Sequence, residues 1–274
     1  MWPTILSLDA PAVVLLWQGL LAWTVSAALG TPEFVVLGCS VWLAYAADRW
    51  IEGWRLVPGT IQTHRHRFNQ QWRWPLAALW AVVLCLDLAT AFRGLPPSEL
   101  RAGGLLLAAV MVYLFSHQLI HRNSRWRAPK EVCVAALLGA GASLFAAARP
   151  GASLHALAIP LALFVLLCFS NCALISVWEN EVDRSHGQTS FALQFGRAAA
   201  LSRVLPWVIV ALSFCIAVAG GKLLRVPSFC ACASGLLLGS IDLVEPRIGR
   251  MMARVLADVA LLTPAVPLAI RHFG

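Results

Sequence analysis

The sequence predicts an all-α integral membrane protein, because of its composition and the lengths of its apolar runs. Of the 274 residues, 59% are hydrophobic and 12% are charged, and the mean hydropathy is +0.74. An ordinary soluble domain has about a quarter of its residues charged. The apolar residues also gather in runs of about 20, the length of helix that crosses the hydrocarbon core of a bilayer.

Nine apolar segments, found in windows of about 20 residues, predict nine transmembrane helices in one bundle. The fold class we expect is therefore a nine-helix all-α membrane bundle. We expect one domain over residues 1–274, with a weak internal duplication of helices 1–4 and 5–8 followed by helix 9. In order, the segments are 12–29, 34–47, 74–92, 103–120, 131–148, 154–177, 201–219, 229–243 and 255–270.

The basic residues predict how these helices are oriented. The connections after the second, fourth, sixth and eighth segments hold 15 of the 21 Lys and Arg residues. Under the positive-inside rule these connections and the N-terminus are cytoplasmic, and the C-terminus lies on the opposite side. The net charge is +8, but the basic residues are scattered between apolar segments, so we do not expect nucleic acid as a partner.

Two polar patches, residues 44–52 and 179–187, interrupt this apolar chain and carry its clearest functional signal. Asp48 and Glu52 are four residues apart in the first patch, as are Glu179 and Asp183 in the second. Residues at this spacing share one face of a helix, so each pair can meet the same ligand. Two such pairs facing each other suit hard cations that hold a diphosphate. The alternative is solvated charge at two helix ends.

The patches resemble the two acidic motifs of the UbiA superfamily of intramembrane prenyltransferases. The family's first motif is Asn-Asp-x-x-Asp-x-x-x-Asp, against Ala-Tyr-Ala-Ala-Asp-Arg-Trp-Ile-Glu at 44–52. Residues 179–197 are similar to the second, Asp-x-x-x-Asp-Arg-x-x-Gly followed by a Ser/Thr-Leu-Ala stretch and a glycine. Residues 127–131, which precede an Ala- and Gly-rich segment, are similar to the family's entry into helix 5. The resemblance extends over the whole chain and implies a UbiA-like bundle with a central cavity that opens to the cytoplasmic side.

The resemblance implies a Mg²⁺-dependent transfer of a prenyl group from an isoprenoid diphosphate to a lipophilic acceptor. Two ions would bridge the motifs and the diphosphate, with Asp48 and Glu52 serving one ion and Glu179 and Asp183 the other. Mg²⁺ prefers oxygen ligands and is usually held by one or two carboxylates together with phosphate oxygens. These four acids are therefore both the predicted metal ligands and the predicted catalytic residues.

Basic side chains near the patches are candidates for binding the diphosphate, because guanidinium groups neutralise the charge of the leaving group. For any single one of them we favour a topological role, and the run 63–68 is equally open to attraction by anionic lipid headgroups. His64 or His66 in that run is a weaker candidate for a base toward an acceptor. The candidates for diphosphate binding are Arg55, Arg65, Arg67, Arg125, Lys130 and Arg184.

Asp87 and Asp258 lie inside predicted spans, where a carboxylate is costly unless it faces a cavity or a partner. Neither matches a motif of the family, and we favour interhelical hydrogen bonds for both. A small-solute transporter, suggested by these two acids and by the polytopic architecture, is a distant alternative.

Two hypotheses remain for the function. The first is a prenyltransferase, favoured because all four acids and the run 187–196 are present. The second is a catalytically degenerate UbiA-like protein that binds an isoprenoid lipid or a partner, favoured because Ala44 and Tyr45 stand where the first motif has Asn and Asp. We favour the enzyme.

Overall fold

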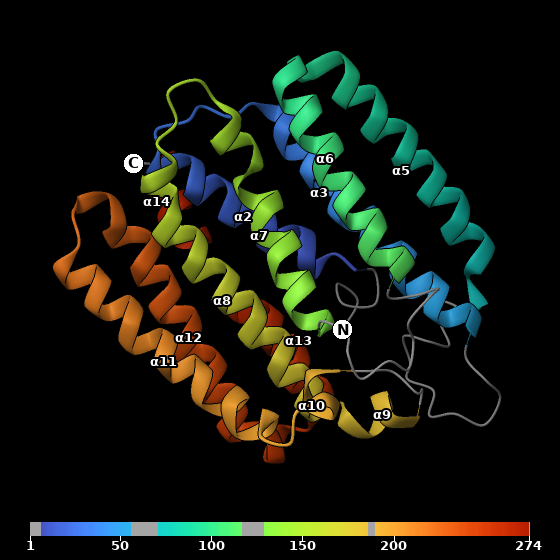
Figure 1. Ribbon diagram of the computed structural model, residues 1–274, viewed down its shortest axis with the longest axis vertical. Coiled ribbons are helices and arrows are strands. Elements are labelled where there is room, and N and C mark those ends of the chain that lie inside the picture. Colours follow the sequence, from blue (N-terminus) through green and yellow to red (C-terminus); the bar gives the residue numbers. More distant parts are fainter. Residues whose placement is uncertain (1–6, 56–70, 117–128, 186–189, 274) are drawn as a thin grey trace.

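The apolar runs of the sequence form long helices in the computed structural model, which describes residues 7–55, 71–116, 129–185 and 190–273, without the side chains of 52–55 and 273 (Figure 1). Every regular element in these ranges is a helix. Successive long helices run up and down the bundle. In chain order they are α2 (Asp9–Thr24), α3 (Thr31–Arg55), α5 (Arg73–Gly94), α6 (Pro97–Phe115), α7 (Lys130–Ala148), α8 (Leu154–Trp178), α9 (Asn180–Ser185), α10 (Phe191–Gln194), α11 (Ala198–Ala219), α12 (Lys222–Ile248), α13 (Arg250–Ala260) and α14 (Ala265–Phe273).

Each of the nine predicted segments overlaps a helix. Within the described ranges, eight helical stretches are long and apolar enough to cross a membrane. The remaining segment, 12–29, corresponds to α2, which has 16 residues and is about 24 Å long at about 1.5 Å per residue. The hydrocarbon core of a bilayer is about 30 Å thick. The count of nine spans therefore stays a prediction, as does the side of the membrane that each end faces.

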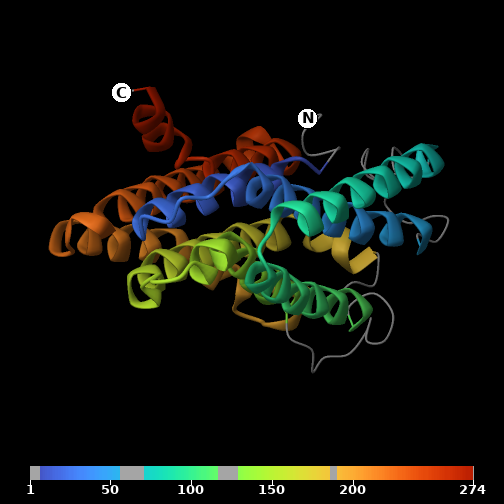
Figure 2. The ribbon, with the colours of Figure 1, turned by 90° about the horizontal axis from the view of Figure 1, so that it is seen from above.

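Helix α2 is enclosed by the rest of the bundle. None of its 16 residues is exposed, and Val14, Trp17 and Leu20 are completely buried. It packs against α3, α7 and α8 and also touches α13 and α14, so it lies between other helices when the bundle is seen from above (Figure 2). The Trp17 ring stacks on Phe164 of α8, with 4.8 Å between the ring centroids. Helix α5, in contrast, is mostly accessible, and Asp87 is its one buried residue.

The first acidic patch lies within a helix, although the sequence predicted that the second apolar segment ends at Ala47. Helix α3 continues through the patch to Arg55. No residue between Ala44 and Glu52 is Gly or Pro, so nothing in this stretch interrupts the backbone hydrogen bonds of a helix. Asp48 and Glu52 are therefore one helical turn apart, as their spacing predicted.

The last predicted segment, 255–270, is two helices rather than one continuous span. The break covers residues 261–264, where Pro264 has no N–H to continue the helical hydrogen bonds. The indole Nε1 of Trp17 in α2 donates a hydrogen bond to the carbonyl oxygen of Leu261 at 3.0 Å. A side chain from another helix thus satisfies a backbone group that the break leaves without a helical partner, as a membrane environment requires.

At the end of the bundle opposite Asp48, Arg149 links three helices. It follows the last residue of α7 and forms ion pairs with Glu33 of α3 and with Glu99 of α6. The distance from its Nε to Oε1 of Glu99 is 3.4 Å. Both carboxylates are buried, and Glu99 is 1% exposed. One guanidinium therefore neutralises two buried acids.

We expect the Arg149→Leu variant to lower the free energy of unfolding by about 3 kcal/mol, because it leaves two buried carboxylates without their cation. Unfolding by denaturant in detergent micelles, followed by tryptophan fluorescence, measures the change. Arg101→Leu is the matched control, since Arg101 is exposed on α6, and it should change the stability by less than about 0.5 kcal/mol. Equal stability of the two variants would show that the ion pairs do not hold this end together.

Candidate active site

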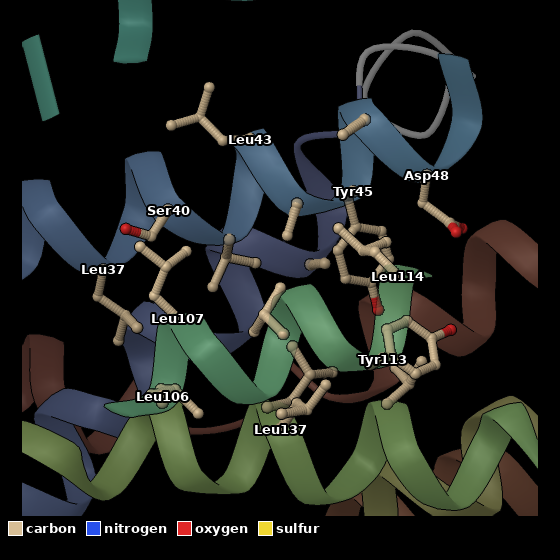
Figure 3. A pocket seen from close by; sticks show the side chains of 18 of the residues that line it. Leu37, Ser40, Leu43, Tyr45, Asp48, Leu106, Leu107, Tyr113, Leu114 and Leu137 are labelled. Atoms are coloured by element: carbon tan, nitrogen blue, oxygen red, sulfur yellow. The ribbon is translucent and has the colours of Figure 1, made fainter. Parts of the chain in front are cut away.

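A cavity of about 920 Å³ lies between two pairs of helices. Helix α5 packs on α3 and α6 packs on α7, and residues of all four helices line the space. Its body is apolar, as the leucines from α3, α6 and α7 in Figure 3 illustrate, among them Leu37, Leu106, Leu107 and Leu137. Protein pockets for small ligands have volumes of about 300–1,000 Å³. The cavity is therefore large enough for a lipid-like ligand.

Charged side chains gather at one end of this cavity, which we call the acidic end. They come from α2, α3, α7, α9 and α13 and from the single residue between α8 and α9. Among the described lining residues of this end the acids outnumber the bases by three, so the end favours added cations. The acids are Asp9, Asp48, Glu131, Glu179, Asp183 and Asp258, and the bases are Arg49, Lys130 and Arg254.

The structure brings three of the four predicted metal ligands to the acidic end. Asp48, Glu179 and Asp183 all line the cavity although the two patches are far apart in the chain. Figure 3 shows Asp48 at this end, close to Tyr45 on the same helix. Glu52 lies one turn further along α3, but its side chain is outside the described part of the chain.

Glu179 and Asp183 have the helical relation that their spacing predicted. Glu179 is the single residue between α8 and α9, and Asp183 lies in α9. The backbone N–H of Asp183 donates to the carbonyl oxygen of Glu179 at 2.9 Å, which is the i to i−4 hydrogen bond of an α-helix. The helical turn therefore continues across the boundary between the two elements.

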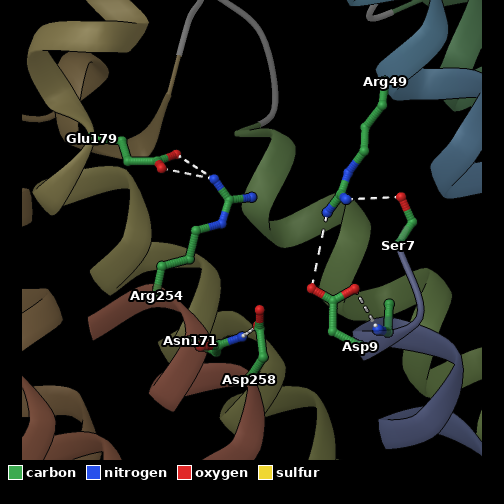
Figure 4. Close-up of polar contacts among 8 residues, drawn as sticks. Ser7, Asp9, Arg49, Asn171, Glu179, Arg254 and Asp258 are labelled. Atoms are coloured by element: carbon green, nitrogen blue, oxygen red, sulfur yellow. Dashed lines mark hydrogen bonds and ion pairs between the residues drawn. The ribbon is translucent and has the colours of Figure 1, made fainter. Parts of the chain in front are cut away.

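Each of these two carboxylates has a basic partner. Nη1 of Arg254 on α13 donates to both carboxylate oxygens of Glu179, at 2.7 and 2.8 Å (Figure 4). Nζ of Lys130, the first residue of α7, lies 3.7 Å from Oδ1 of Asp183. Sequence reasoning counted Arg254 only toward topology and missed this pairing. The available signal was its position four residues before Asp258, which places both side chains on one face of a helix.

Three further polar contacts tie the N-terminal part and α13 to this end of the cavity. Nη1 of Arg49 donates to Oγ of Ser7 at 2.8 Å, and Nη2 lies 4.0 Å from Oδ2 of Asp9. Nδ2 of Asn171 on α8 donates to Oδ1 of Asp258 at 3.1 Å. Figure 4 shows both groups beside the Glu179 pair. The interhelical hydrogen bond predicted for Asp258 is confirmed, whereas Asp9 and Arg49 were not predicted as residues of the site.

The predicted diphosphate-binding residues are placed unequally. Lys130 lines the acidic end, whereas Arg184 is exposed and is not among the residues that line the cavity. Arg55 lies in α3 with its side chain outside the described part. Arg65, Arg67 and Arg125, and the two histidines His64 and His66, lie outside the described residues.

The acidic end suits a magnesium ion that arrives with its substrate better than a preformed metal centre. Among the described residues, no three His, Cys, Asp or Glu side chains are gathered so that they could hold an ion on their own. Mg²⁺ bound with a phosphorylated substrate needs only one or two carboxylates, with phosphate oxygens and water as its other ligands. The acidic side chains here offer oxygen donors only, and Oε2 of Glu131 is buried without a hydrogen-bond partner among the described residues. The donor set therefore fits the ion.

No protein-family model and no curated protein matches this chain. Among solved structures, the apo structure of a UbiA homolog from Aeropyrum pernix K1 is similar, with a TM-score of 0.62. The match covers 97% of this chain and 99% of that chain at 17% sequence identity. This chain has the UbiA fold. The resemblance inferred from the two acidic patches is thus confirmed at the level of the fold, and the eight apolar helices in this fold make the chain an integral membrane protein.

Within the UbiA fold, this chain departs from the family pattern at the first acidic motif. Tyr45 stands where the motif has Asp, and its side chain lines the cavity. The guanidinium of Arg49 lies 5.9 Å from the centre of the Tyr45 ring. Asp9 and Asp258 add negative charge to the same end from α2 and α13. The acidic end therefore draws its charge from more helices than the two motifs alone.

Proposed function

We propose that this protein transfers a prenyl group from an isoprenoid diphosphate to a lipophilic acceptor, with Mg²⁺ as the cofactor. The observation that carries the proposal is a single cavity with a charged end and a long apolar body. A prenyl diphosphate has the same two parts, since its diphosphate needs cations and its chain needs apolar surroundings. The UbiA fold supports the proposal, because the resemblance of the acidic patches pointed to the same chemistry.

In this proposal Asp48, Glu179 and Asp183 would hold Mg²⁺, and the bound ion would supply positive charge for the diphosphate leaving group. Lys130 and Arg254 bind diphosphate oxygens, because cationic donors form their strongest hydrogen bonds to anionic phosphate. Both already lie at the acidic end, beside the carboxylates. The leucine-rich walls keep water away from the prenyl carbon, so that the acceptor reacts in its place.

Purified protein incubated with farnesyl, geranylgeranyl and longer diphosphates tests this proposal. We expect release of diphosphate with Mg²⁺ and with at least one of these chain lengths, and no release with EDTA, because the acids at the site need the cation to hold an anionic substrate. Reactions without protein are the control. Failure to bind any prenyl diphosphate at any Mg²⁺ concentration would contradict the proposal.

Binding without transfer is the second candidate function. Two observations favour it. Arg254 forms hydrogen bonds to both carboxylate oxygens of Glu179, a predicted metal ligand, and Tyr45 stands where the first motif has an acid. A protein of this kind would gain thermal stability from a prenyl alcohol or diphosphate equally with Mg²⁺ and with EDTA, and would release no diphosphate. The same incubations therefore separate the two candidates.

A further inference from the structure

Asp87 places a carboxylate in the apolar body of the cavity, away from the acidic end. The side chain lies on α5, is 7% exposed and lines the cavity together with Ser40 of α3. Oγ of Ser40 donates to Oδ2 of Asp87 at 2.8 Å, which confirms the predicted interhelical hydrogen bond. The other oxygen, Oδ1, is buried and has no hydrogen-bond partner among the described residues. One half of this carboxylate therefore still needs a donor.

A buried carboxylate oxygen without a donor is destabilising. The desolvation penalty of an unsatisfied buried polar group is about 1–3 kcal/mol, and it is larger for a charged one. Ionisable side chains inside membrane-spanning helices usually face a cavity and mark the path or site of a ligand. Asp87 meets this description, because it lines the cavity and lies inside a span.

The cavity has room beside this carboxylate. Asp87 lies seven residues before the end of α5, and Gly103 lies six residues after the start of α6, so both are about 10 Å from the short connection between these helices. Gly103 and Gly104 line the cavity, and a Cβ atom on either would meet no heavy atom within 4 Å. Ser40 lies eight residues before Asp48 on α3, so the space is about 12 Å from Asp48 along the helix axis.

We infer that Asp87 and Ser40 form a polar subsite that binds a hydrogen-bond donor, a hydroxyl or amino group, carried by an otherwise apolar ligand. An ionised carboxylate only accepts hydrogen bonds, so the ligand must donate to Oδ1. The surrounding leucines contact the rest of the ligand. The inference rests on the proposed function in one respect, because it places the ligand in the cavity proposed for the prenyl substrate. Its test measures binding without Mg²⁺ or diphosphate, so either can fail while the other stands.

Three ligands with the same chain separate recognition of a donor from burial of the chain. Farnesol offers a hydroxyl, farnesylamine offers an amine, and farnesyl methyl ether keeps the oxygen but cannot donate. Their affinities are measured by tryptophan fluorescence in detergent micelles for the wild type and for Asp87→Leu and Asp87→Asn. Asp48→Asn is the matched control, because it changes a carboxylate at the acidic end of the same cavity.

We expect the wild type to bind farnesol about tenfold more tightly than the methyl ether, the difference that one hydrogen bond to a charged group supplies. In Asp87→Leu the two affinities should become equal, and in Asp87→Asn binding of farnesylamine should weaken about tenfold because the charge is lost. Asp48→Asn should keep the wild-type preference. If Asp87→Leu does not fold, the amine result with Asp87→Asn decides.

Three outcomes would overturn the inference. The first is a wild type that binds farnesol and the ether equally. The second is an unchanged preference in the Asp87 variants, with a change in stability alone, which would make the Asp87–Ser40 hydrogen bond a packing contact. The third is loss of the preference in Asp48→Asn and not in Asp87→Leu, which would place the donor at the acidic end.

Discussion

The Asp48→Asn and Asp183→Asn variants should each lower kcat by a factor of about 10²–10³, the loss that follows removal of one group that stabilises charge in a transition state. Both side chains line the acidic end of the cavity, and Asp183 is 7% exposed. The change to Asn keeps the size of the side chain and removes the negative charge that we propose binds Mg²⁺. Initial rates of diphosphate release from the preferred prenyl diphosphate measure the effect.

Glu181→Gln is the matched control for this prediction. Glu181 lies in α9 two residues before Asp183, but its side chain is 85% exposed and its carboxylate is 3.6 Å from Nη1 of Arg250. Removing its charge should leave kcat within about twofold of the wild type, since surface substitutions have small effects. If all three variants keep the wild-type rate, the two acids do not take part in the reaction and the binding protein becomes the better description.

We expect Arg254→Leu to lower the free energy of unfolding by about 2–3 kcal/mol. Arg254 and Glu179 have side-chain exposures of 19% and 22%, so the pair is largely removed from water. Breaking a buried pair leaves one charge uncompensated, and the cost of about 3–5 kcal/mol for complete burial is reduced here by the remaining exposure. Unfolding by denaturant in EDTA measures the change.

The double variant Glu179→Leu/Arg254→Leu separates the pair from packing effects. It should recover most of the stability lost in the single variant, because neither charge is then left alone. Addition of Mg²⁺ should also restore part of the stability of Arg254→Leu, since a cation then compensates Glu179. A single variant as stable as the wild type would mean that water already compensates Glu179 in this cavity.

The long helices were predictable from the sequence because a membrane-spanning helix needs a continuous apolar run. The helical relation of Glu179 and Asp183 was also predictable, because residues four apart in a helix lie on the same face. The extension of α3 to Arg55 was not, because hydropathy marks where the apolar surface ends and not where helical hydrogen bonds end. The break at 261–264 was missed because mean hydropathy over a window does not register Pro264, which cannot continue the hydrogen bonds of a helix.

The pairings at the site were beyond the reach of sequence patterns. Arg254 binds Glu179 across 75 residues of chain, and Glu131 accepts a hydrogen bond from the backbone N–H of Phe191 across 60 residues. The spacing of Arg254 and Asp258 places both on one helix face, but it does not identify Glu179 as the partner of Arg254. Such pairs depend on which helix ends meet in space, and only the fold supplies that information.

The enclosure of α2 limits where a mismatch with the bilayer thickness can act on this protein. A helix exposed to lipid must match the hydrocarbon thickness or tilt and deform the membrane around it. Because no residue of α2 is exposed, its length of about 24 Å lies mostly against the helices around it. Hydrophobic mismatch therefore acts mainly on outward-facing helices such as α5. Helix α2, whose Trp17 donates a hydrogen bond to Leu261 in the break between α13 and α14, is largely shielded from it.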